Sequence, residues 1–153
     1  KVPIIKTNRG GKTTYHGPGQ RIIYLMIDLN KRKKDIRKFV NIIEESLVMI
    51  LKDLDIEAKT FPNRVGIWVT KSKNKKLFKE KKIGAIGLRI KKWVTYHGLS
   101  FNLNPQLKYY KNIHACGLKN YSNTSIDDLK YKLNLNDFDK LFLKNFKKKL
   151  KKF

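Results

Sequence analysis

Residues 9–20 form the stretch of this chain whose composition is best suited to building a binding site. They read Arg-Gly-Gly-Lys-Thr-Thr-Tyr-His-Gly-Pro-Gly-Gln. Glycine tolerates positive φ and close approach by a ligand, and proline fixes one φ and removes one donor, so neither a regular helix nor a strand fits. Turns are also rich in glycine for purely geometric reasons. We interpret residues 9–20, the glycine-rich loop, as a site-building segment that exposes backbone N–H groups beside Arg9 and His16.

The only cysteine, Cys116, lies in the sequence Ile-His-Ala-Cys-Gly-Leu. A single cysteine forms no intramolecular disulfide and no thiolate metal cluster, so its thiol is free for nucleophilic chemistry. The alternative is a small buried hydrophobic residue, which is a common role for an unpaired cysteine. The three histidines of the chain show no zinc-ligand spacing with Cys116, so we predict no metal site.

Two further motifs accompany these segments. The tetrapeptide Thr-Tyr-His-Gly occurs at residues 14–17 and again at 95–98, and Lys82 opens the segment Lys-Ile-Gly-Ala-Ile-Gly-Leu-Arg. Together with the glycine-rich loop and the Cys116 segment, in this order, they resemble the lipoyl(octanoyl) transferase family, also called lipoate-protein ligase B. The resemblance extends from Arg9 to about Tyr121.

The resemblance implies an acyltransferase of protein lipoylation. Members of this family transfer an octanoyl group from octanoyl-acyl carrier protein to a lysine of an apo lipoyl domain, as found in 2-oxoacid dehydrogenases and the glycine cleavage H protein. It needs no cofactor beyond the phosphopantetheine that the acyl carrier protein brings. The catalytic cysteine of the family falls on Cys116, and its paired lysine falls on Lys82. The substrate contacts of the family fall on Arg9, Gly10, Gly11, Lys12, Thr13, Thr14, Tyr15, His16, Ala85, Ile86, Gly87, Gly98, Leu99 and Ser100.

The chemistry that such a pair performs follows from the substrate. A thioester is already activated, so a thiolate accepts the acyl group without ATP, and an amine then takes it as a stable amide. A free cysteine thiol has a pKa of about 8.5 and is mostly protonated at neutral pH, so a nearby ammonium such as that of Lys82 would favour the thiolate. Lys82 would also relay the proton of the incoming amine. From spacing alone, Lys82 is one more surface lysine.

Other residues of the expected site have more than one reading. His16 could hydrogen-bond the acyl carbonyl, act as a second base, or fix the loop, whereas we expect His97 to be architectural. An eight-carbon chain needs apolar walls, for which Tyr15, Ile86 and Leu99 are suitable. Backbone N–H groups near Gly117, Gly87 or Gly11 are candidates for stabilising the tetrahedral oxyanion.

The elements that position these residues are predicted from hydrophobic periodicity. Residues 21–29 are apolar and β-branched, which is typical of a central strand. Apolar residues recur at helical spacing from Ile36, after Asp35 as N-cap, and predict a helix that ends near Asp53. Residues 57–61 and 65–70 read as a hairpin, and the lysine-rich stretch 71–81 reads as an exposed connection.

The second half of the chain continues this pattern. Residues 84–90 and 94–104 read as two more strands, and residues 105–117 read as a second functional loop. Ser125 marks the expected start of a short helix, and Asn136 is the expected cap of a final helix. The pattern predicts an α+β fold. It agrees with the biotin/lipoate ligase-like mixed sheet with flanking helices that the resemblance implies.

The length of 153 residues predicts one catalytic domain over 1–153. The family has early strands ahead of the glycine-rich loop, so we expect N-terminal strands to be missing here. No long apolar run and no secretory leader is visible, which favours a cytoplasmic monomer with no membrane partner.

The formal charge of +24 makes nucleic acid the competing partner. However, the excess lysine is scattered over every segment and no aromatic-basic recognition motif is present, so we expect no nucleic-acid function. A positive surface would instead steer the acidic carrier and lipoyl domains. An ATP-dependent lipoate or biotin ligase of the same fold remains the alternative enzyme, and it would not need Cys116.

Overall fold

The computed structural model describes residues 2–73, 75–113 and 121–153, except for the side chains of Lys111 and Asn112. In this part of the chain, five strands form one antiparallel sheet in the order β1-β5-β4-β3-β2. The strands are β1 (Gln20–Tyr24), β2 (Ile56–Phe61), β3 (Arg64–Ser72), β4 (Lys75–Lys91) and β5 (Val94–Asn102). The helices are η1 (Leu29–Lys31), α1 (Ile36–Lys52), η2 (Leu107–Asn112) and α2 (Leu135–Leu150). The predicted α+β class is confirmed.

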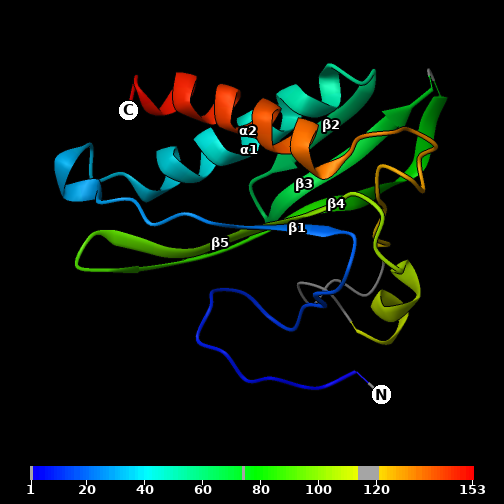
Figure 1. Ribbon diagram of the computed structural model, residues 1–153, viewed down its shortest axis with the longest axis horizontal. Helices are drawn as coiled ribbons and strands as arrows, with labels where there is room; N and C mark the ends of the chain where they lie inside the picture. The colour runs from blue at the N-terminus through cyan, green and yellow to red at the C-terminus, as the bar shows by residue number, and fades with distance from the viewer. Residues whose placement is uncertain (1, 74, 114–120) are drawn as a thin grey trace.

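The two α-helices lie side by side on one face of the sheet (Figure 1). The hydrophobic core fills the space between these layers. Phe101 of β5 stacks on Phe138 of α2 with ring centroids 4.7 Å apart. Ile67 of β3 and Ile43 of α1 have no exposed surface. This face of the sheet is therefore closed, and a ligand must approach from the other face.

Helix α1 begins as the sequence predicts. The side chain of Asp35 accepts a hydrogen bond from the backbone N–H of Lys38 at 2.9 Å, which satisfies one of the free donors of the first turn. The helix ends at Lys52, beside the predicted boundary. Its fully buried apolar residues recur at helical spacing: Phe39, Ile43, Leu47, Ile50 and Leu51.

Helix α2 begins earlier than predicted. Asn136 is not the cap, because Asn134 accepts from the backbone N–H of Asp137 at 2.9 Å and donates to the Asp137 carboxylate at 2.7 Å. This reciprocal pair is a stronger cap than a single acceptor, so the helix begins at Leu135. Its aromatic side packs on the core as expected, with Phe142 and Phe146 stacked at 5.4 Å.

The lysine-rich stretch 71–81 is not an exposed connection, so that prediction is wrong. β4 begins at Lys75 and pairs with β3, with Lys76 opposite Lys71. Backbone pairing supports this strand although it is rich in lysine, and an ion pair at 3.4 Å between Arg64 and Glu80 joins the two strands. The hairpin of β3 and β4 therefore extends beyond the core.

The predicted central strand at 21–29 is a shorter edge strand of the described sheet, β1. Beyond Tyr24 the chain still follows β5, since Leu25 N–H donates to His97 O at 2.8 Å and Thr95 N–H donates to Ile27 O at 3.0 Å. His97 has a φ of +60°, which interrupts the pleat of β5 and with it the regular ladder.

The predicted helix at Ser125 is a single turn. The hydroxyl of Ser125 accepts a hydrogen bond from the N–H of Asp128 at 3.0 Å, and the carbonyl oxygen of Ser125 accepts one from the N–H of Leu129 at 3.1 Å. The turn ends at Lys130, whose φ of +64° is left-handed and does not continue a helix.

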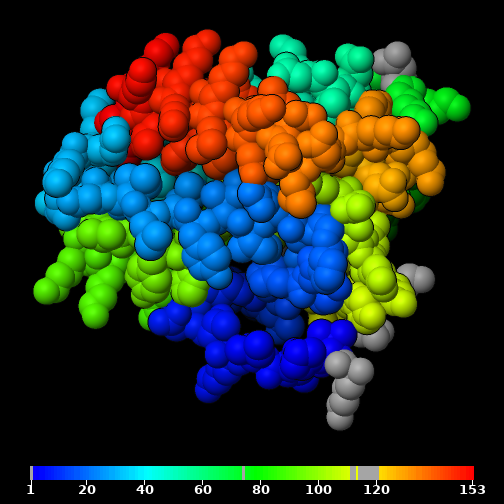
Figure 2. All heavy atoms as spheres, viewed as in Figure 1, coloured from blue at the N-terminus to red at the C-terminus, as the bar shows by residue number. Residues whose placement is uncertain are grey.

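The segment before β1 crosses the face of the sheet opposite the helices (Figure 1). A Cβ at Gly10 would lie 2.6 Å from the carbonyl oxygen of Leu88, so this segment rests directly on the backbone of β4. Figure 2 shows a hollow beside it, at the lower edge of the molecule. Neither α1 nor α2 combines the length and apolar character that crossing a membrane requires.

Candidate active site

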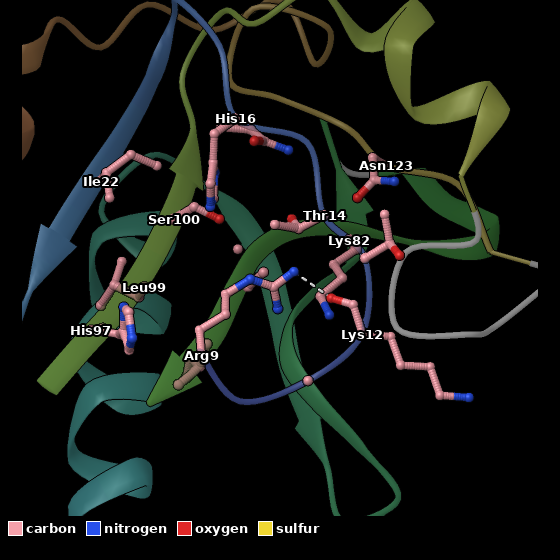
Figure 3. A pocket seen from close by; sticks show the side chains of 18 of the residues that line it. Arg9, Lys12, Thr14, His16, Ile22, Lys82, His97, Leu99, Ser100 and Asn123 are labelled. Atoms are coloured by element: carbon pink, nitrogen blue, oxygen red, sulfur yellow. Dashed lines mark hydrogen bonds between the residues drawn. The ribbon is translucent and has the colours of Figure 1, made fainter. Parts of the chain in front are cut away.

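A pocket lies between the glycine-rich loop and the open face of the sheet (Figure 3). It draws residues from the loop, from β1, β4 and β5, and from Asn123. The predicted site residues that line it are Arg9, Gly11, Lys12, Thr13, Thr14, His16, Lys82, Ala85, Ile86, Gly87, Gly98, Leu99 and Ser100. Three predicted segments that are distant in sequence, 9–16, 82–87 and 98–100, thus meet in one hollow, while the roles of these residues stay predictions.

The floor of the pocket consists of small residues on adjacent strands. Ala85 of β4 and Ile22 of β1 are both Cα partners of Ser100 of β5, and Gly87 pairs with Gly98. Cross-strand partners share one face of a sheet. Because Ala85, Ser100 and the glycines at 87 and 98 have short side chains or none, the floor leaves room for a ligand to lie against the strands.

Ile86 and Leu99 have the opposite orientation. They pair with each other, and Leu99 lies two residues before Phe101, which stacks on α2. Since alternate residues of a strand share a face, both side chains point toward the helices and belong to the core. Both residues nevertheless line the pocket, so the prediction that they form its apolar walls stays a prediction.

The glycine-rich loop is curled by its own arginine. The guanidinium of Arg9 donates to the carbonyl oxygen of Gly10 at 2.8 Å and also to that of Lys12. Gly11 has a φ of +85°, which glycine adopts without strain. In Figure 3 the Arg9 side chain reaches up into the hollow from below while its tip is tied to Lys12.

His16 enters the pocket from the opposite side (Figure 3). Its Nδ1 lies 3.1 Å from Oε1 of Gln20, which also accepts from the N–H of Gly17 at 3.3 Å. The amide nitrogen of Gln20 donates to Asn102 at 2.9 Å and to the hydroxyl of Tyr110 at 2.5 Å, which sets the orientation of the amide. An amide oxygen only accepts, so Nδ1 of His16 must donate and its Nε2 is the acceptor in the neutral ring.

Tyr15 and Gly10 do not line the pocket. The ring of Tyr15 packs against Tyr109 and Tyr110, with centroids 5.0 and 5.5 Å away. The hydroxyl of Tyr110 donates to the carbonyl oxygen of Tyr15 at 3.4 Å. These contacts connect the glycine-rich loop to η2. Tyr15 therefore stabilises the position of the loop and does not form an apolar wall of the pocket.

Lys82 is buried, with 4% of its surface exposed. Strict alternation would place it on the helix-covered face with Gly84. However, Ile67 pairs with Gly84 and the next residue, Trp68, pairs with Lys82, so Ile83 is an extra residue in β4. Such a β-bulge turns the side chains of its strand, and Lys82 consequently lines the pocket.

The ammonium of Lys82 is held by contacts with Val65 and Trp68, which together we call its seat. It donates to the carbonyl oxygen of Val65 at 3.0 Å and lies 5.3 Å from the ring centre of Trp68. A cation over an aromatic face is attracted by the ring quadrupole. Lys82 is therefore a positioned amine and not one of the solvated surface lysines.

The segment after Cys116 is anchored beside Lys82. Lys82 N–H donates to Ser122 O at 2.9 Å, and Thr124 N–H donates to Lys82 O at 2.8 Å. β5 ends at Asn102, and beyond this point residues 122–124 run beside β4 in its place. The side-chain amide of Asn102 donates to Thr124 O at 2.9 Å, which joins the two segments. Cys116 itself lies outside the described residues, so its predicted pairing with Lys82 stays a prediction.

Sequence reasoning missed several residues of the pocket. Ile22 and Tyr24 alternate along β1, and Asn102 follows Ser100 by two positions, so strand alternation alone could have found them. Tyr110 and Asn123 carry no local signal, because long-range hydrogen bonds and a single bridge to Lys82 place them. Within residues 2–73, 75–113 and 121–153, no three His, Cys, Asp or Glu residues are grouped to hold a metal ion.

The fold of this sheet and helix layer is that of the biotin and lipoate protein ligases. Biotin protein ligase from Aquifex aeolicus superposes with a TM-score of 0.63 at 15% identity, over 88% of this chain and 54% of that one. A putative lipoate protein ligase from T. acidophilum with bound lipoic acid superposes with a TM-score of 0.67 at 16% identity, over 94% of this chain and 57% of that one.

Sequence comparison gives the family. Residues 1–147 match the lipoyl protein ligase A/B catalytic domain, and the chain belongs to this family. It is 46% identical to the octanoyltransferase of Wolbachia pipientis wMel, over 95% of this chain and 69% of that protein. It is 44% identical to that of Parvibaculum lavamentivorans, over 96% and 65%. The chain thus spans about two thirds of the length of these relatives. The resemblance to the lipoyl(octanoyl) transferases is confirmed.

Proposed function

We propose that this chain transfers an octanoyl group from octanoyl-acyl carrier protein, through a thioester on Cys116, to a lysine of an apo lipoyl domain. The observation that carries the proposal is the pocket in which a buried lysine, Lys82, adjoins a floor of small residues. The similarity to octanoyltransferases supports the acyl group transferred.

The first half-reaction loads Cys116. Its thiolate attacks the thioester carbonyl, the new carbon–sulfur bond forms, and the phosphopantetheine thiolate leaves and takes a proton from the Lys82 ammonium, which becomes a neutral amine. The acyl chain would lie on the floor formed by Ala85, Ser100 and the glycine pair at 87 and 98. His16 reaches the same hollow with Nε2 as an acceptor, which suits an amide N–H of the phosphopantetheine arm.

The second half-reaction unloads Cys116. The amine of the acceptor lysine attacks the thioester, loses a proton to the neutral amine of Lys82, and forms the amide as the thiolate of Cys116 leaves, which restores the ammonium and the thiolate. Lys82 suits this relay because Val65 and Trp68 hold its ammonium in one place. The anchoring of residues 122–124 on β4 supports the pairing, since Asn123 follows Cys116 by only seven positions in the sequence.

The decisive experiment incubates the chain with octanoyl-acyl carrier protein and measures octanoylation of Cys116 by mass spectrometry, without ATP. We expect the wild-type chain to carry the octanoyl group and the Cys116→Ala variant to carry none. Lys82→Met, which keeps the length but not the charge, should slow transfer to a lipoyl domain by at least about a hundredfold. Transfer by Cys116→Ala that requires ATP and free octanoate would instead identify a ligase.

The same proposal covers partners and location. Acyl carrier proteins and lipoyl domains are acidic, and a chain of net charge +24 attracts them, so kcat/KM should fall as ionic strength rises. Neutral octanoyl-pantetheine is the matched control, because its kcat/KM should hardly depend on salt. The proposal includes a cytoplasmic reaction that requires no nucleic acid, no membrane and no bound cofactor.

A further inference from the structure

Glu44 of α1 is a buried carboxyl group that the proposed reaction does not use. Only 7% of its surface is exposed, and its Oε1 accepts a hydrogen bond from the N–H of Gly66 at 3.3 Å. Burial raises its pKa above the ordinary value of 4.5, although the Gly66 hydrogen bond and the charge of Lys82 act in the opposite direction. A buried carboxyl is costly to keep in a core, so its position needs a reason.

The peptide group between Val65 and Gly66 connects Glu44 to Lys82. Its N–H donates to Glu44, and its carbonyl oxygen accepts from the ammonium of Lys82 at 3.0 Å. A trans peptide directs its N–H and C=O to opposite sides, so α1 holds one end of this group and the lysine binds the other. Hydrogen bonds in such a chain also strengthen each other.

Gly66 completes the seat of the lysine. Its φ of +128° is a conformation that side chains other than glycine rarely adopt. A Cβ at this position would lie 2.6 Å from Cε and 3.0 Å from Nζ of Lys82. The stem of the lysine therefore lies directly on the backbone of Gly66, and a small rotation of this peptide group would displace the ammonium.

We propose that Glu44 is a positioning residue for the transfer reaction, because it fixes the Val65–Gly66 peptide group that holds the ammonium of Lys82. This inference rests on the proposed function, in which Lys82 relays the proton of the acceptor amine. Glu44 acts through its acceptor oxygen and does not contact the substrate.

The test compares two variants of similar length. Glu44→Gln keeps the acceptor oxygen, whereas Glu44→Met fills the same space without one. We expect Glu44→Gln to retain kcat of octanoyl transfer within about twofold, and Glu44→Met to lower kcat about tenfold with little change in KM for octanoyl-acyl carrier protein. Equal kcat values for the two variants would overturn the proposal, whether both match the wild type or both are impaired.

A second measurement does not depend on activity. Acetic anhydride labels accessible amines, and mass spectrometry reports the labelling rate of each lysine. Lys82 should stay protected in the wild type and in Glu44→Gln and should label several times faster in Glu44→Met, while the exposed Lys12 labels equally in all three. Unchanged protection of Lys82 in a folded Glu44→Met chain would refute its positioning by Glu44. Should Glu44→Met unfold, Glu44→Leu gives the same comparison.

These two readouts separate the proposals. If the wild-type chain transfers no octanoyl group, the proposed function fails, yet the labelling of Lys82 still decides whether Glu44 holds its seat. If the wild type transfers the group and Glu44→Met does so equally well, only the positioning role fails.

Discussion

The two copies of Thr-Tyr-His-Gly have the same sequence and different structures. In the first copy, residues 14–17, His16 is exposed and the chain is a loop above the pocket. In the second copy, residues 95–98, Thr95 and Gly98 are buried within β5. The hydroxyl of Thr95 donates to Leu25 O at 2.7 Å, so this threonine ties the strand to its neighbour.

The difference shows that the residues that a motif contacts, and not its sequence alone, determine its role. His97 of the second copy also lines the pocket, but its Nε2 lies 2.9 Å from the side chain of Asn8 and its ring packs on Tyr96, so it supports the loop segment from the sheet. His16 of the first copy is oriented by Gln20 and enters the pocket. The second copy is thus part of the scaffold that positions the first. Four substitutions test this division.

Gly98→Ala should have the largest effect. A Cβ at this position would collide with the backbone carbonyl of Ile23, which belongs to the paired strand β1 and cannot rotate away. We expect a loss of about 3 kcal/mol in the free energy of unfolding, measured by urea denaturation. A stability equal to the wild type would show that the pairing of β1 with β5 is not as tight as described.

Thr95→Val should have the second-largest effect on the free energy of unfolding. The hydroxyl donates to Leu25 O and accepts from the N–H of Ile27 at 3.0 Å, and valine leaves both groups unpaired in the interior. We expect a loss of about 2 kcal/mol in the free energy of unfolding. The matched control is Thr14→Val in the first copy, which should change stability by less than about 0.5 kcal/mol. Equal losses at both positions would contradict the scaffold role of the second copy.

His16 should affect catalysis more than stability. His16→Ala is expected to lower kcat/KM for octanoyl transfer about tenfold, because Nε2 no longer meets the substrate. His16→Asn is the control, since its amide nitrogen replaces Nδ1 as the donor to Gln20 but offers nothing at Nε2. Recovery of activity in His16→Asn would show that the histidine only orients its loop.

Gly17→Ala should have the smallest effect. It is the first-copy counterpart of Gly98, but the nearest atoms to an added Cβ belong to the phenol end of Tyr15, a side chain that can shift. We expect less than about 1 kcal/mol of destabilisation in the same urea titration. A loss as large as that of Gly98→Ala would mean that the packing of Tyr15 on Tyr109 is rigid.

Much of the fold could be predicted from local patterns. Asp35 and the helical period after it predicted α1, and the alternation in residues 84–90 and 94–104 predicted the hairpin of β4 and β5. The lysine-rich start of β4 could not be predicted, because its lysines carry no apolar alternation and its pairing with β3 decides the structure. Asn134, and not Asn136, caps α2, because it forms reciprocal hydrogen bonds with Asp137.

The site was predicted less completely. The glycine-rich loop and the segments at 82–87 and 98–100 do meet in one pocket. The facing of Ile86 and Leu99 follows from the strand register with Phe101, which depends on pairing between distant segments. The bond between Gln20 and Tyr110 joins residues ninety positions apart, and no local pattern announces it. The orientation of Lys82 depends on the single extra residue at Ile83.

That extra residue has a consequence for how the sequence can diverge. The outer half of β4 is mostly lysine, but it also carries Leu77, which packs against the core, and Glu80, which pairs with Arg64. If Ile83 paired with Trp68 in a regular register, Lys82 would face the helix layer, and an ammonium would lie among hydrocarbon side chains. Divergence around residues 82–84 must therefore preserve the side of the sheet that Lys82 faces.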